Sequence, residues 1–462
     1  MLLIPVPLYY QTKMENPKSA ILIGAGNRGQ TYAAYALKHP NQLRIVAVAD
    51  PIQERRDKVA RQHNIVPENT HQSWEDVAST SIVADGAIIA TQDSMHVDPT
   101  LMALKKGMHV VLEKPMALTE ADCLKLIEAA QKSGLTLNVC HVLRYTHFFS
   151  RVKQILDSGE IGDVITMALS ENVSYHHMAH AYVRGNWGNS QTSSPMILAK
   201  CCHDLDLIQW FVGSRPVSVS SAGNLTHFTA QNAPDGAPQR CTDGCPQAGS
   251  CKFEAVDTYR NGKHMKLAIA NSDFKLMALA AKLMLRFPGL AGKIPGLSRY
   301  RVWQEWPTST ITEDLTDPGI MQALKTGLYG RCVYFCDNDQ VDHQETLIEF
   351  DNGATAVLKM HGHSAREGRT LRIDGSQGTL RGYFGGGGRL EVQVHATGEK
   401  KTYEIKTDLF GHAEGDEGIM ENFVEVLNGE TGATNADEAL ISHQLAFAAH
   451  EARLGNTIVK LG

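Results

Sequence analysis

The chain has 462 residues, of which 43% are hydrophobic and 20% are charged. This length and composition predict more than one folded domain with an ordinary apolar core and exclude a disordered or fibrous protein. Its 44 Lys and Arg against 50 Asp and Glu give a formal net charge of -6, so no overall basic field exists to hold a nucleic acid.

The first 17 residues are expected to form a disordered leader. They lack a basic n-region and a signal-peptidase site, and Pro5 and Pro7 interrupt their short apolar run. No stretch of the chain approaches the roughly 20 unbroken apolar residues that span a bilayer. The nine cysteines suit a reducing compartment better than a disulfide framework. We therefore expect a cytoplasmic protein with neither a nucleic-acid nor a membrane partner.

A glycine-rich turn follows the first expected strand, at 19–24. The turn has the spacing G-x-G-x-x-G and opens a helix, as in dinucleotide-binding domains. Its glycines permit a tight turn and let a pyrophosphate approach the free N–H groups at the helix start. The cofactor-binding residues predicted here are Gly24, Gly26, Asn27, Arg28 and Gly29.

The second expected strand, at 43–49, ends at Asp50. A carboxylate at this position can accept hydrogen bonds from the adenosine ribose hydroxyls, and its charge repels a 2′-phosphate. The motif therefore predicts NAD as cofactor, while Arg55 and Arg56 just beyond leave NADP open.

Further strands at 86–90 and 109–112 alternate with helical segments, which predicts a doubly wound parallel sheet over residues 18–142. Ligands of such sheets bind beyond the carboxyl ends of the strands. The residues expected there, as additional cofactor contacts, are Thr91, Gln92, His96, Glu113 and Lys114.

The glycine-rich turn, Asp50 and the tripeptide Glu113-Lys114-Pro115 together resemble the Gfo/Idh/MocA oxidoreductases. The segment 161–164 (IGDV) and the later helix with His203 extend the resemblance over most of the chain. It implies an α/β protein: an N-terminal Rossmann domain, then an α+β domain at 143–462 with a large open, mostly antiparallel sheet. An open sheet face in that domain would be too apolar to leave in water, so we also predict a homodimer or homotetramer.

By this resemblance Lys114 lies beside the nicotinamide and the substrate hydroxyl, and His203 is the catalytic histidine. An imidazole can take the hydroxyl proton near neutral pH, and an ammonium can orient the oxygen. Many relatives carry an aspartate four residues before the histidine, where this chain has Ala199. We expect Lys200 to share the helix face of His203 and to join Tyr182 in the catalytic set.

The segment 171–187 is dense in Tyr, His, Arg and Trp, which is typical of a site for a hydroxyl-rich ligand. A second polar cluster lies at 329–344. No acidic partner or regular His spacing indicates a metal here. The residues predicted to contact a sugar or glycoside are Arg144, Tyr175, His176, His180, Tyr182, Arg184, Asn186, Trp187, Tyr329 and Arg331.

The region 236–328 reads as an insertion into the second domain. Cys241, Cys245 and Cys251 have the spacing C-x3-C-x5-C, which is no standard zinc pattern, so we favour a structural loop and leave a metal open. The segment 274–287 is a basic amphipathic helix, which we expect to pack on its own domain or a neighbouring subunit rather than a membrane. Short strands between 345 and 395 fit an antiparallel sheet, with the hairpin turn GGGG at 385–388.

Three functions stay open. The first is an NAD-dependent oxidoreductase that transfers hydride between a sugar or glycoside ring hydroxyl and nicotinamide. The second, also implied by the resemblance, is an NAD-dependent glycoside hydrolase that uses transient C3 oxidation, C1–C2 elimination, water addition and re-reduction. The third is a non-catalytic NAD-binding sensor, which the presence of both Lys114 and His203 disfavours.

Overall fold

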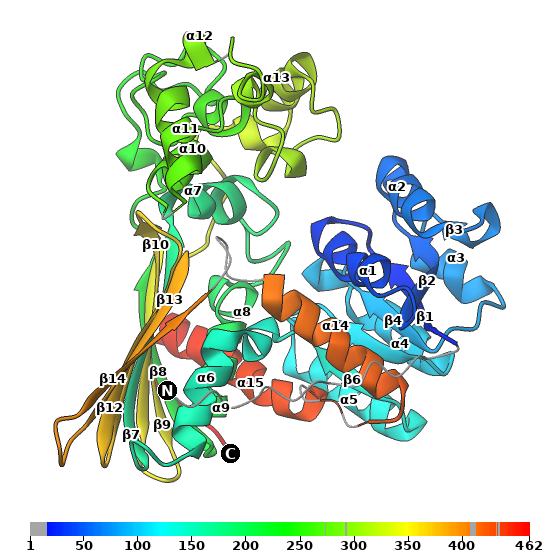
Figure 1. The fold of residues 1–462 in the computed structure, drawn as a ribbon, viewed down its shortest axis with the longest axis vertical. Helices are drawn as coiled ribbons and strands as arrows, with labels where there is room; N and C mark the ends of the chain where they lie inside the picture. The colour runs from blue at the N-terminus through cyan, green and yellow to red at the C-terminus, as the bar shows by residue number, and fades with distance from the viewer. Residues whose placement is uncertain (1–15, 273, 292, 407–412, 431, 433–434) are drawn as a thin grey trace.

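The computed structural model describes residues 16–272, 274–291, 293–406, 413–430, 432 and 435–462. Two sheets organise these residues, and helices lie between them (Figure 1). The expected leader lies almost wholly outside the described residues.

The first sheet has six parallel strands in the order β3-β2-β1-β4-β5-β6. They are β1 Lys18–Ile23, β2 Leu43–Ala49, β3 Thr70–His71, β4 Gly86–Ile89, β5 His109–Leu112 and β6 Leu137–Val139. The connecting helices are α1 Asn27–Lys38, α2 Gln53–His63, α3 Trp74–Ser79, α4 Val97–Lys105 and α5 Glu120–Ser133. The buried strands are apolar runs that alternate with helices, and the predicted doubly wound sheet is confirmed.

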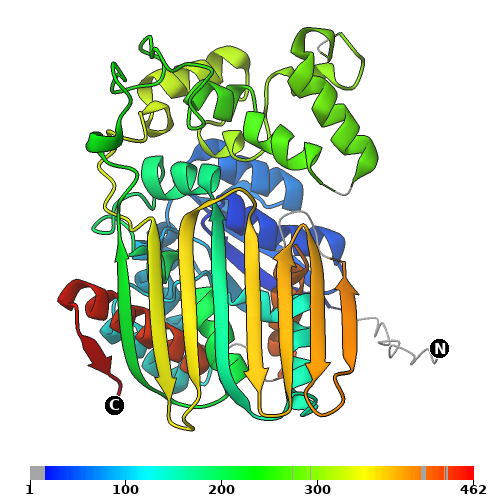
Figure 2. The same ribbon diagram turned by 90° about the vertical axis from the view of Figure 1, so that its left-hand side faces the viewer.

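The second sheet has nine strands in the order β14-β13-β12-β11-β7-β10-β9-β8-β15, and only β7 and β10 pair in parallel (Figure 2). The strands are β7 Val164–Ser174, β8 Pro216–Asn224, β9 His343–Phe350, β10 Thr355–Ser364, β11 Gly368–Gly375, β12 Gly378–Gly385, β13 Gly387–Val394, β14 Lys400–Ile405 and β15 Ile458–Lys460. The mostly antiparallel sheet is therefore confirmed, and the glycine run forms the β12–β13 hairpin as predicted.

One face of this sheet packs on helices, and the other is open in Figure 2. The covering helices are α6 His147–Asp157, α9 Cys202–Val212 and α15 Ala436–Gly455. Residues of β9 alternate between buried and exposed, and the exposed positions include Glu345, Leu347 and Glu349. At β9 the open face is therefore partly polar, as is typical of a sheet face in contact with water. The homodimer or homotetramer stays a prediction.

The residues between β8 and β9 form a helical insertion at one end of the molecule (Figure 1). Its helices are α10 Lys263–Ala270, α11 Lys275–Arg286, α12 Pro288–Ala291 and α13 Asp317–Thr326. The short helices α7 Tyr175–His177 and α8 Met196–Ala199 and a π-helix at Met178–Arg184 lie between β7 and α9. This part of the chain connects the large sheet to the insertion.

A C-terminal helix, α14 Ala413–Leu427, completes the core of the first domain. Ile419, Met420 and Phe423 are fully buried there with Leu22 of β1. A Cβ at Gly86 would lie 2.5 Å from the Phe423 ring, so this glycine is what lets the ring reach β4. The first sheet thus depends on a helix from the far end of the chain.

We expect Phe423→Ala to lower the free energy of unfolding by about 3–5 kcal/mol, because it removes a fully buried ring and leaves a cavity. Urea unfolding measures this change. The exposed ring of Phe274 provides the control: Phe274→Ala should alter stability by less than about 0.5 kcal/mol. Equal effects of the two substitutions would contradict the packing of α14.

Candidate active site

The glycine-rich turn has the geometry that a dinucleotide needs. Gly24 has a φ of +91°, and a Cβ there would lie 2.4 Å from the Ala90 carbonyl oxygen. A Cβ at Gly29 would lie 1.9 Å from the Gly24 oxygen. At Gly26, by contrast, the nearest atom to such a Cβ is a guanidinium nitrogen of Arg55 at 3.9 Å, so the space is open. Gly24 and Gly29 serve the turn itself, and Gly26 leaves room for a pyrophosphate.

Helix α1 begins at Asn27, and no side chain caps its first N–H groups. Its first turn holds no acidic residue, so these N–H groups and the helix dipole can receive an anion. Asp50 is buried beside the turn, where it accepts hydrogen bonds from the N–H groups of Ala25 at 2.7 Å and Ile52 at 2.8 Å. These residues fit an NAD with its pyrophosphate on α1 and its ribose at Asp50.

Arg28 and Glu113, both predicted to contact the cofactor, lie at the same edge of the sheet and form an ion pair with each other. Arg28 Nε donates to Glu113 Oε1 at 2.6 Å, and its other nitrogens bond Asp416 of α14. Tyr32 donates to Glu113 at 2.8 Å. Burial opposes ionisation of Glu113, yet Arg28 and Lys114 keep its pKa below the usual range. The pair ties α1 and the end of β5 to the C-terminal helix.

The segment after β4 supports the loop that carries Lys114. His96 is buried, with Nδ1 2.6 Å from the Pro115 carbonyl oxygen and Nε2 3.3 Å from that of Thr91. The Thr91 hydroxyl donates to the Met95 carbonyl at 3.0 Å, and Gln92 immediately precedes the short helix at Asp93–Met95. His96 therefore acts here by holding two loops together.

Lys114 reaches across to the second domain. Its Nζ donates to the carbonyl oxygen of Ala199 at 2.6 Å. Ala199 ends α8, and α9 begins at Cys202, so the expectation that Lys200 shares a helix face with His203 is wrong. His203 is buried in the first turn of α9, with its ring centroid 5.7 Å from that of His141. The contact brings the lysine of the nucleotide domain to the segment that leads into His203.

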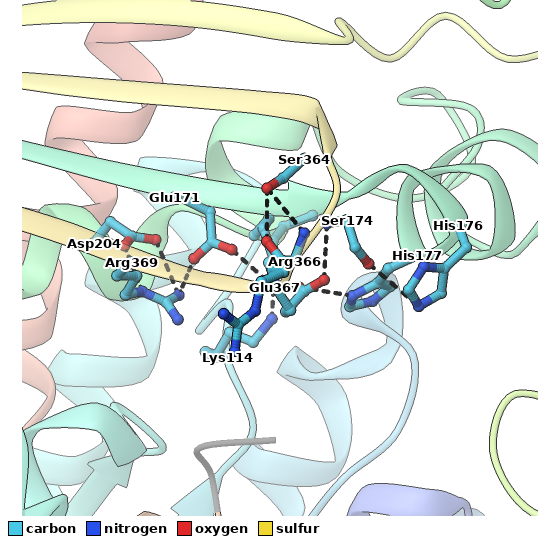
Figure 3. A network of polar contacts seen from close by, with 12 residues as sticks. Lys114, Glu171, Ser174, His176, His177, Asp204, Ser364, Arg366, Glu367 and Arg369 are labelled. Carbon is cyan, nitrogen blue, oxygen red and sulfur yellow. Dashed lines mark hydrogen bonds and ion pairs between the residues drawn. The ribbon is translucent and has the colours of Figure 1, made fainter. Parts of the chain in front are cut away.

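Lys200 instead contacts a network of charges, in which Glu171, Asp204 and Arg369 are buried and Glu367 is half-buried; Figure 3 shows these four residues. Its Nζ lies 3.6 Å from Glu171 Oε1 and 3.5 Å from Glu367 Oε1. Arg369 pairs with Glu171 and, at 2.7 Å, with Asp204. Glu171, Glu367 and Arg369 were absent from the predicted site, because the alternation of a strand does not tell which buried polar residues meet.

The two carboxyl groups of this network differ in acidity. Burial raises the pKa of Glu171 to about 7, although Arg369 and Lys200 oppose the shift. At Glu367 burial is outweighed by His177 and Lys200, which hold its pKa well below the usual range. The Lys200 ammonium is also buried, and the same carboxylates raise its pKa. Two carboxyl groups with separated pKa values can act as an acid and a base near neutral pH.

An aromatic wall borders the network. The His177 Nδ1 lies 2.9 Å from Glu367 Oε1, and its ring centroid is 6.1 Å from that of Tyr182 and 5.3 Å from that of Trp306. Tyr182 is buried, and burial raises its pKa well above the usual value. Trp187 packs 6.1 Å from Tyr182 and donates to Asp93 at 3.1 Å. Of the predicted residues, Tyr182 and Trp187 thus lie with Lys200.

The other predicted aromatic and histidine contacts pair with the insertion. Tyr175 bonds His264 at 2.8 Å, and the His176 ring stacks on His264 with centroids 5.4 Å apart. Burial lowers the pKa of His176 to about 4. His180 bonds the Tyr259 hydroxyl at 3.0 Å and stacks on Tyr329 at 4.9 Å. These ring contacts join α7 and the π-helix to the insertion.

The predicted arginines have internal partners. Arg184 is buried and donates to the carbonyls of Arg331 and Phe253, both at 2.7 Å. Arg331 pairs with Asp337, and Arg144 makes a bidentate contact with Asp206 at 2.7 and 2.8 Å. Asn186 is exposed. The structure does not bring these four residues together with Lys200.

Cysteines gather beside Arg184. Cys241, Cys245 and Cys251 line a small cavity together with Cys332, and Arg184 donates to the Cys241 sulfur at 3.5 Å. The sequence spacing alone did not indicate Cys332. Across the described part of the chain, no three His, Cys, Asp or Glu side chains form a group that could hold a metal ion.

A parallel Rossmann sheet with this glycine turn, in contact through Lys114 with the end of α8 in a second domain built on a large sheet, defines a two-domain nucleotide-dependent oxidoreductase fold. Residues 18–141 match the NAD-binding Rossmann domain of the GFO/IDH/MocA oxidoreductases, and residues 149–245 match a C-terminal domain of that family. Both domains thus match models of the Gfo/Idh/MocA family, and the first is an NAD-binding Rossmann domain, as predicted.

Two curated relatives illustrate the range of the family. The chain is 27% identical over 207 residues to 2,7-anhydro-N-acetylneuraminate hydratase of Escherichia coli, an alignment of 45% of this chain and 53% of the relative. It is 26% identical over 216 residues to inositol 2-dehydrogenase of Streptomyces avermitilis, or 46% of this chain and 58% of the relative. The chain spans only slightly more than half the length of these relatives.

The fold is also similar to that of scyllo-inositol dehydrogenase from Lactobacillus casei, solved with NAD(H) and scyllo-inositol. The TM-score is 0.61 at 16% sequence identity, over 96% of this chain and 99% of that one. The two-sheet architecture is therefore shared over almost the whole chain.

We expect Gly26→Ala to weaken NAD binding by at least about tenfold while the thermal unfolding temperature stays within about 2 °C, because the added methyl group meets open space rather than protein. Titration of protein fluorescence with NAD and a thermal melt measure the two effects. In Gly29→Ala the methyl group collides with the Gly24 oxygen, so this variant should lose both stability and binding. Unchanged affinity in Gly26→Ala would contradict the proposed pyrophosphate position.

A buried histidine holds the loop after Lys114 and makes stability depend on pH. His443 of α15 accepts the Met116 N–H at Nε2, 2.8 Å, and its Nδ1 lies 2.7 Å from the Ala439 carbonyl. Both contacts fit a neutral ring with its proton on Nδ1. Burial and nearby His141 lower the pKa of His443 to about 3.

Since an unfolded histidine titrates near about 6.5, the unfolded state binds more protons between the two pKa values. The contribution of His443 to stability is therefore present above about pH 6.5 and is lost as the pH falls toward 3. Urea unfolding at pH 7.5, 6 and 5 should show this loss, with a slope reduced by up to about 1.4 kcal/mol per pH unit in His443→Gln. His147→Gln, at an exposed ring, should keep the original slope.

Proposed function

We propose that this protein is an NAD-dependent oxidoreductase that transfers a hydride between nicotinamide and the carbon of a ring hydroxyl in a sugar or related polyol. The observation that carries the proposal is the 2.6 Å contact from Lys114 Nζ to the Ala199 carbonyl. It brings an ammonium from the NAD-binding domain to the segment that leads into His203. The second domain supplies buried acid, base and aromatic groups along the same segment.

Each residue has a definite task in this proposal. Bound NAD supplies the hydride acceptor. The Lys114 ammonium binds the substrate oxygen and stabilises the negative charge that develops on it as the proton leaves. The His203 imidazole takes that proton as the general base. Tyr182 and Trp187 offer aromatic faces to the C–H surface of a ring.

The choice of a polyol rests on these aromatic faces and on the relatives. The dehydrogenases of Streptomyces avermitilis and Lactobacillus casei are named for inositols. Arg55 pairs with Glu313 at 2.8 Å, and Arg56 donates to the Asp50 and Pro51 carbonyls. Because both arginines already have partners within the protein, neither is placed to bind the 2′-phosphate of NADP, and NAD is favoured.

A second candidate is a redox-neutral reaction in which oxidation is transient and a glycosidic or ether bond is cleaved. The charge network favours it, because simple hydride transfer has no need of Glu171, Lys200 and Glu367. Glu171 has a pKa of about 7 and can give or take a proton at neutral pH, as elimination and water addition both require. The hydratase of Escherichia coli is a relative at 27% identity.

We expect Lys114→Met and His203→Asn each to lower kcat/KM at least about 100-fold, because each removes a group that handles the reacting oxygen or its proton. Their affinity for NAD should stay within about threefold. Lys105→Met, at an exposed lysine of α4, is the matched control and should keep both activity and affinity. Unchanged kcat/KM in Lys114→Met would contradict the role proposed for the ammonium, whereas an unchanged biological activity of this variant without any measurable turnover would support the sensor alternative.

The substrate assay uses NAD with aryl glycosides, free sugars and cyclitols, and follows NADH absorbance and aglycone release in one cuvette. Stoichiometric NADH would support the dehydrogenase. Aglycone release without NADH would support the redox-neutral reaction, and Glu171→Gln should then lower the rate far more than the affinity for NAD. No signal from any of these substrates in protein that binds NAD would contradict both proposals.

A further inference from the structure

Helix α11 exposes a row of large apolar side chains. Leu276 is 82% and Leu279 is 67% exposed, and Phe287 just beyond the helix end is also exposed. On its other side Ala278 and Ala281 are buried, and α10 is the neighbouring helix. Figure 1 shows α11 and α12 in the insertion at one end of the molecule, beyond the edge of the large sheet. Of the two expected packing partners for this helix, its own domain leaves these large apolar residues exposed, and packing on a neighbouring subunit stays a prediction.

The exposed residues form a continuous stripe. At about 100° per residue, the exposed positions 276, 279 and 287 and the half-buried Leu283 lie on the side of the helix opposite to Ala278 and Ala281. Lys275, Lys282 and Arg286, spaced by seven and four residues, form a second stripe directly beside it. We call these two stripes together the α11 patch; it consists of Lys275, Leu276, Leu279, Lys282, Leu283, Arg286 and Phe287.

The charge around the patch has one sign. Residues 274–304 contain six Lys and Arg and no Asp or Glu, although the whole chain has a net charge of -6. Three further basic residues follow the helix: Lys293, Arg299 and Arg301. The exposed side chain of Leu290 lies in the sequence between Phe287 and Lys293. An apolar stripe bordered by cations is complementary to a surface with an outer anionic layer and an apolar layer beneath it.

We propose that the α11 patch binds the surface of an anionic lipid bilayer, with α11 lying in the plane of the interface. In that position Leu276, Leu279 and Phe287 enter the boundary of the acyl chains, while the neighbouring cations meet lipid phosphates. The helix has 12 residues, too few to cross a bilayer. No helix in the described parts of the chain is long and apolar enough to do so.

A second copy of the chain is a poorer occupant for the same patch. In a two-fold symmetric contact the patch would face itself, which brings the basic stripes of two copies together with no carboxylate of residues 274–304 between them. A bilayer with anionic headgroups satisfies the leucines and the cations at once. The large sheet and the NAD-binding domain are not needed for this contact, so the inference stands apart from the proposed reaction.

The test is cosedimentation of the full chain with vesicles of phosphatidylcholine alone and with an added fraction of phosphatidylglycerol. We expect binding to the anionic vesicles, weak binding to phosphatidylcholine, and release as salt is raised. Leu276→Ser/Leu279→Ser should weaken binding at least about tenfold, because it removes the residues that enter the acyl boundary. Lys275→Gln/Lys282→Gln should weaken it roughly fivefold for each charge removed.

The matched control is Val83→Ser/Leu454→Ser, which removes two apolar side chains that are 87% and 65% exposed elsewhere on the surface. It should bind vesicles as the unaltered protein does, and all variants should bind NAD equally. The proposal is overturned if the unaltered protein stays in solution with anionic vesicles, or if Leu276→Ser/Leu279→Ser binds them undiminished. It is also overturned if sedimentation without lipid shows self-association that this variant abolishes, since a second copy then covers the patch.

Discussion

The contact of Lys114 with the Ala199 carbonyl is the point on which the arrangement of the site depends. Lys114 stands at the carboxyl end of β5, where the nucleotide domain presents its ligands, and Ala199 ends the helix before His203. The loop after Lys114 is fixed in turn by His96 and His443, which bond Pro115 and Met116. A lysine side chain has four carbons and rotates about the bonds between them, so a defined position of the ammonium requires a rigid backbone at Lys114.

The charges near Lys200 lie directly after position 199, where this chain has an alanine in place of an aspartate. Glu171 and Glu367 face Lys200, Arg369 pairs with Glu171 and Asp204, and His177 is a further partner of Glu367. Burial still raises the pKa of Glu171 to about 7, because it outweighs the opposing effects of Arg369 and Lys200. Buried charge networks are commonly costly for stability, and carboxyl groups with shifted pKa values are concentrated at sites of chemistry.

The fold could be predicted largely from the sequence, because its signals are local. The turn at Gly24 to Gly29 and the strand that ends at Asp50 follow from glycine spacing and apolar runs. The site was harder to predict from the sequence, because its residues come together only in the tertiary structure. Glu171 and Glu367, far apart in sequence, both lie near Lys200 because β11 pairs with β7. The prediction that Lys200 lies on the helix of His203 was wrong, because the break between α8 and α9 at residues 200–201 carries no Gly or Pro signal.

The insertion touches the cofactor side of the molecule as well as carrying the α11 patch. The pair of Arg55 and Glu313 links it to the first helix after Asp50, and both side chains are partly exposed. Exposed pairs of this kind contribute about 0–1 kcal/mol, so this link alone does not fix the insertion to the nucleotide domain. What holds the insertion is its other side, where His180 and Arg184 of the π-helix bond Tyr259, Phe253 and Arg331. That π-helix also carries Tyr182, whose ring lies 6.1 Å from that of His177 in the charge network, so the insertion and the candidate site share one structural element.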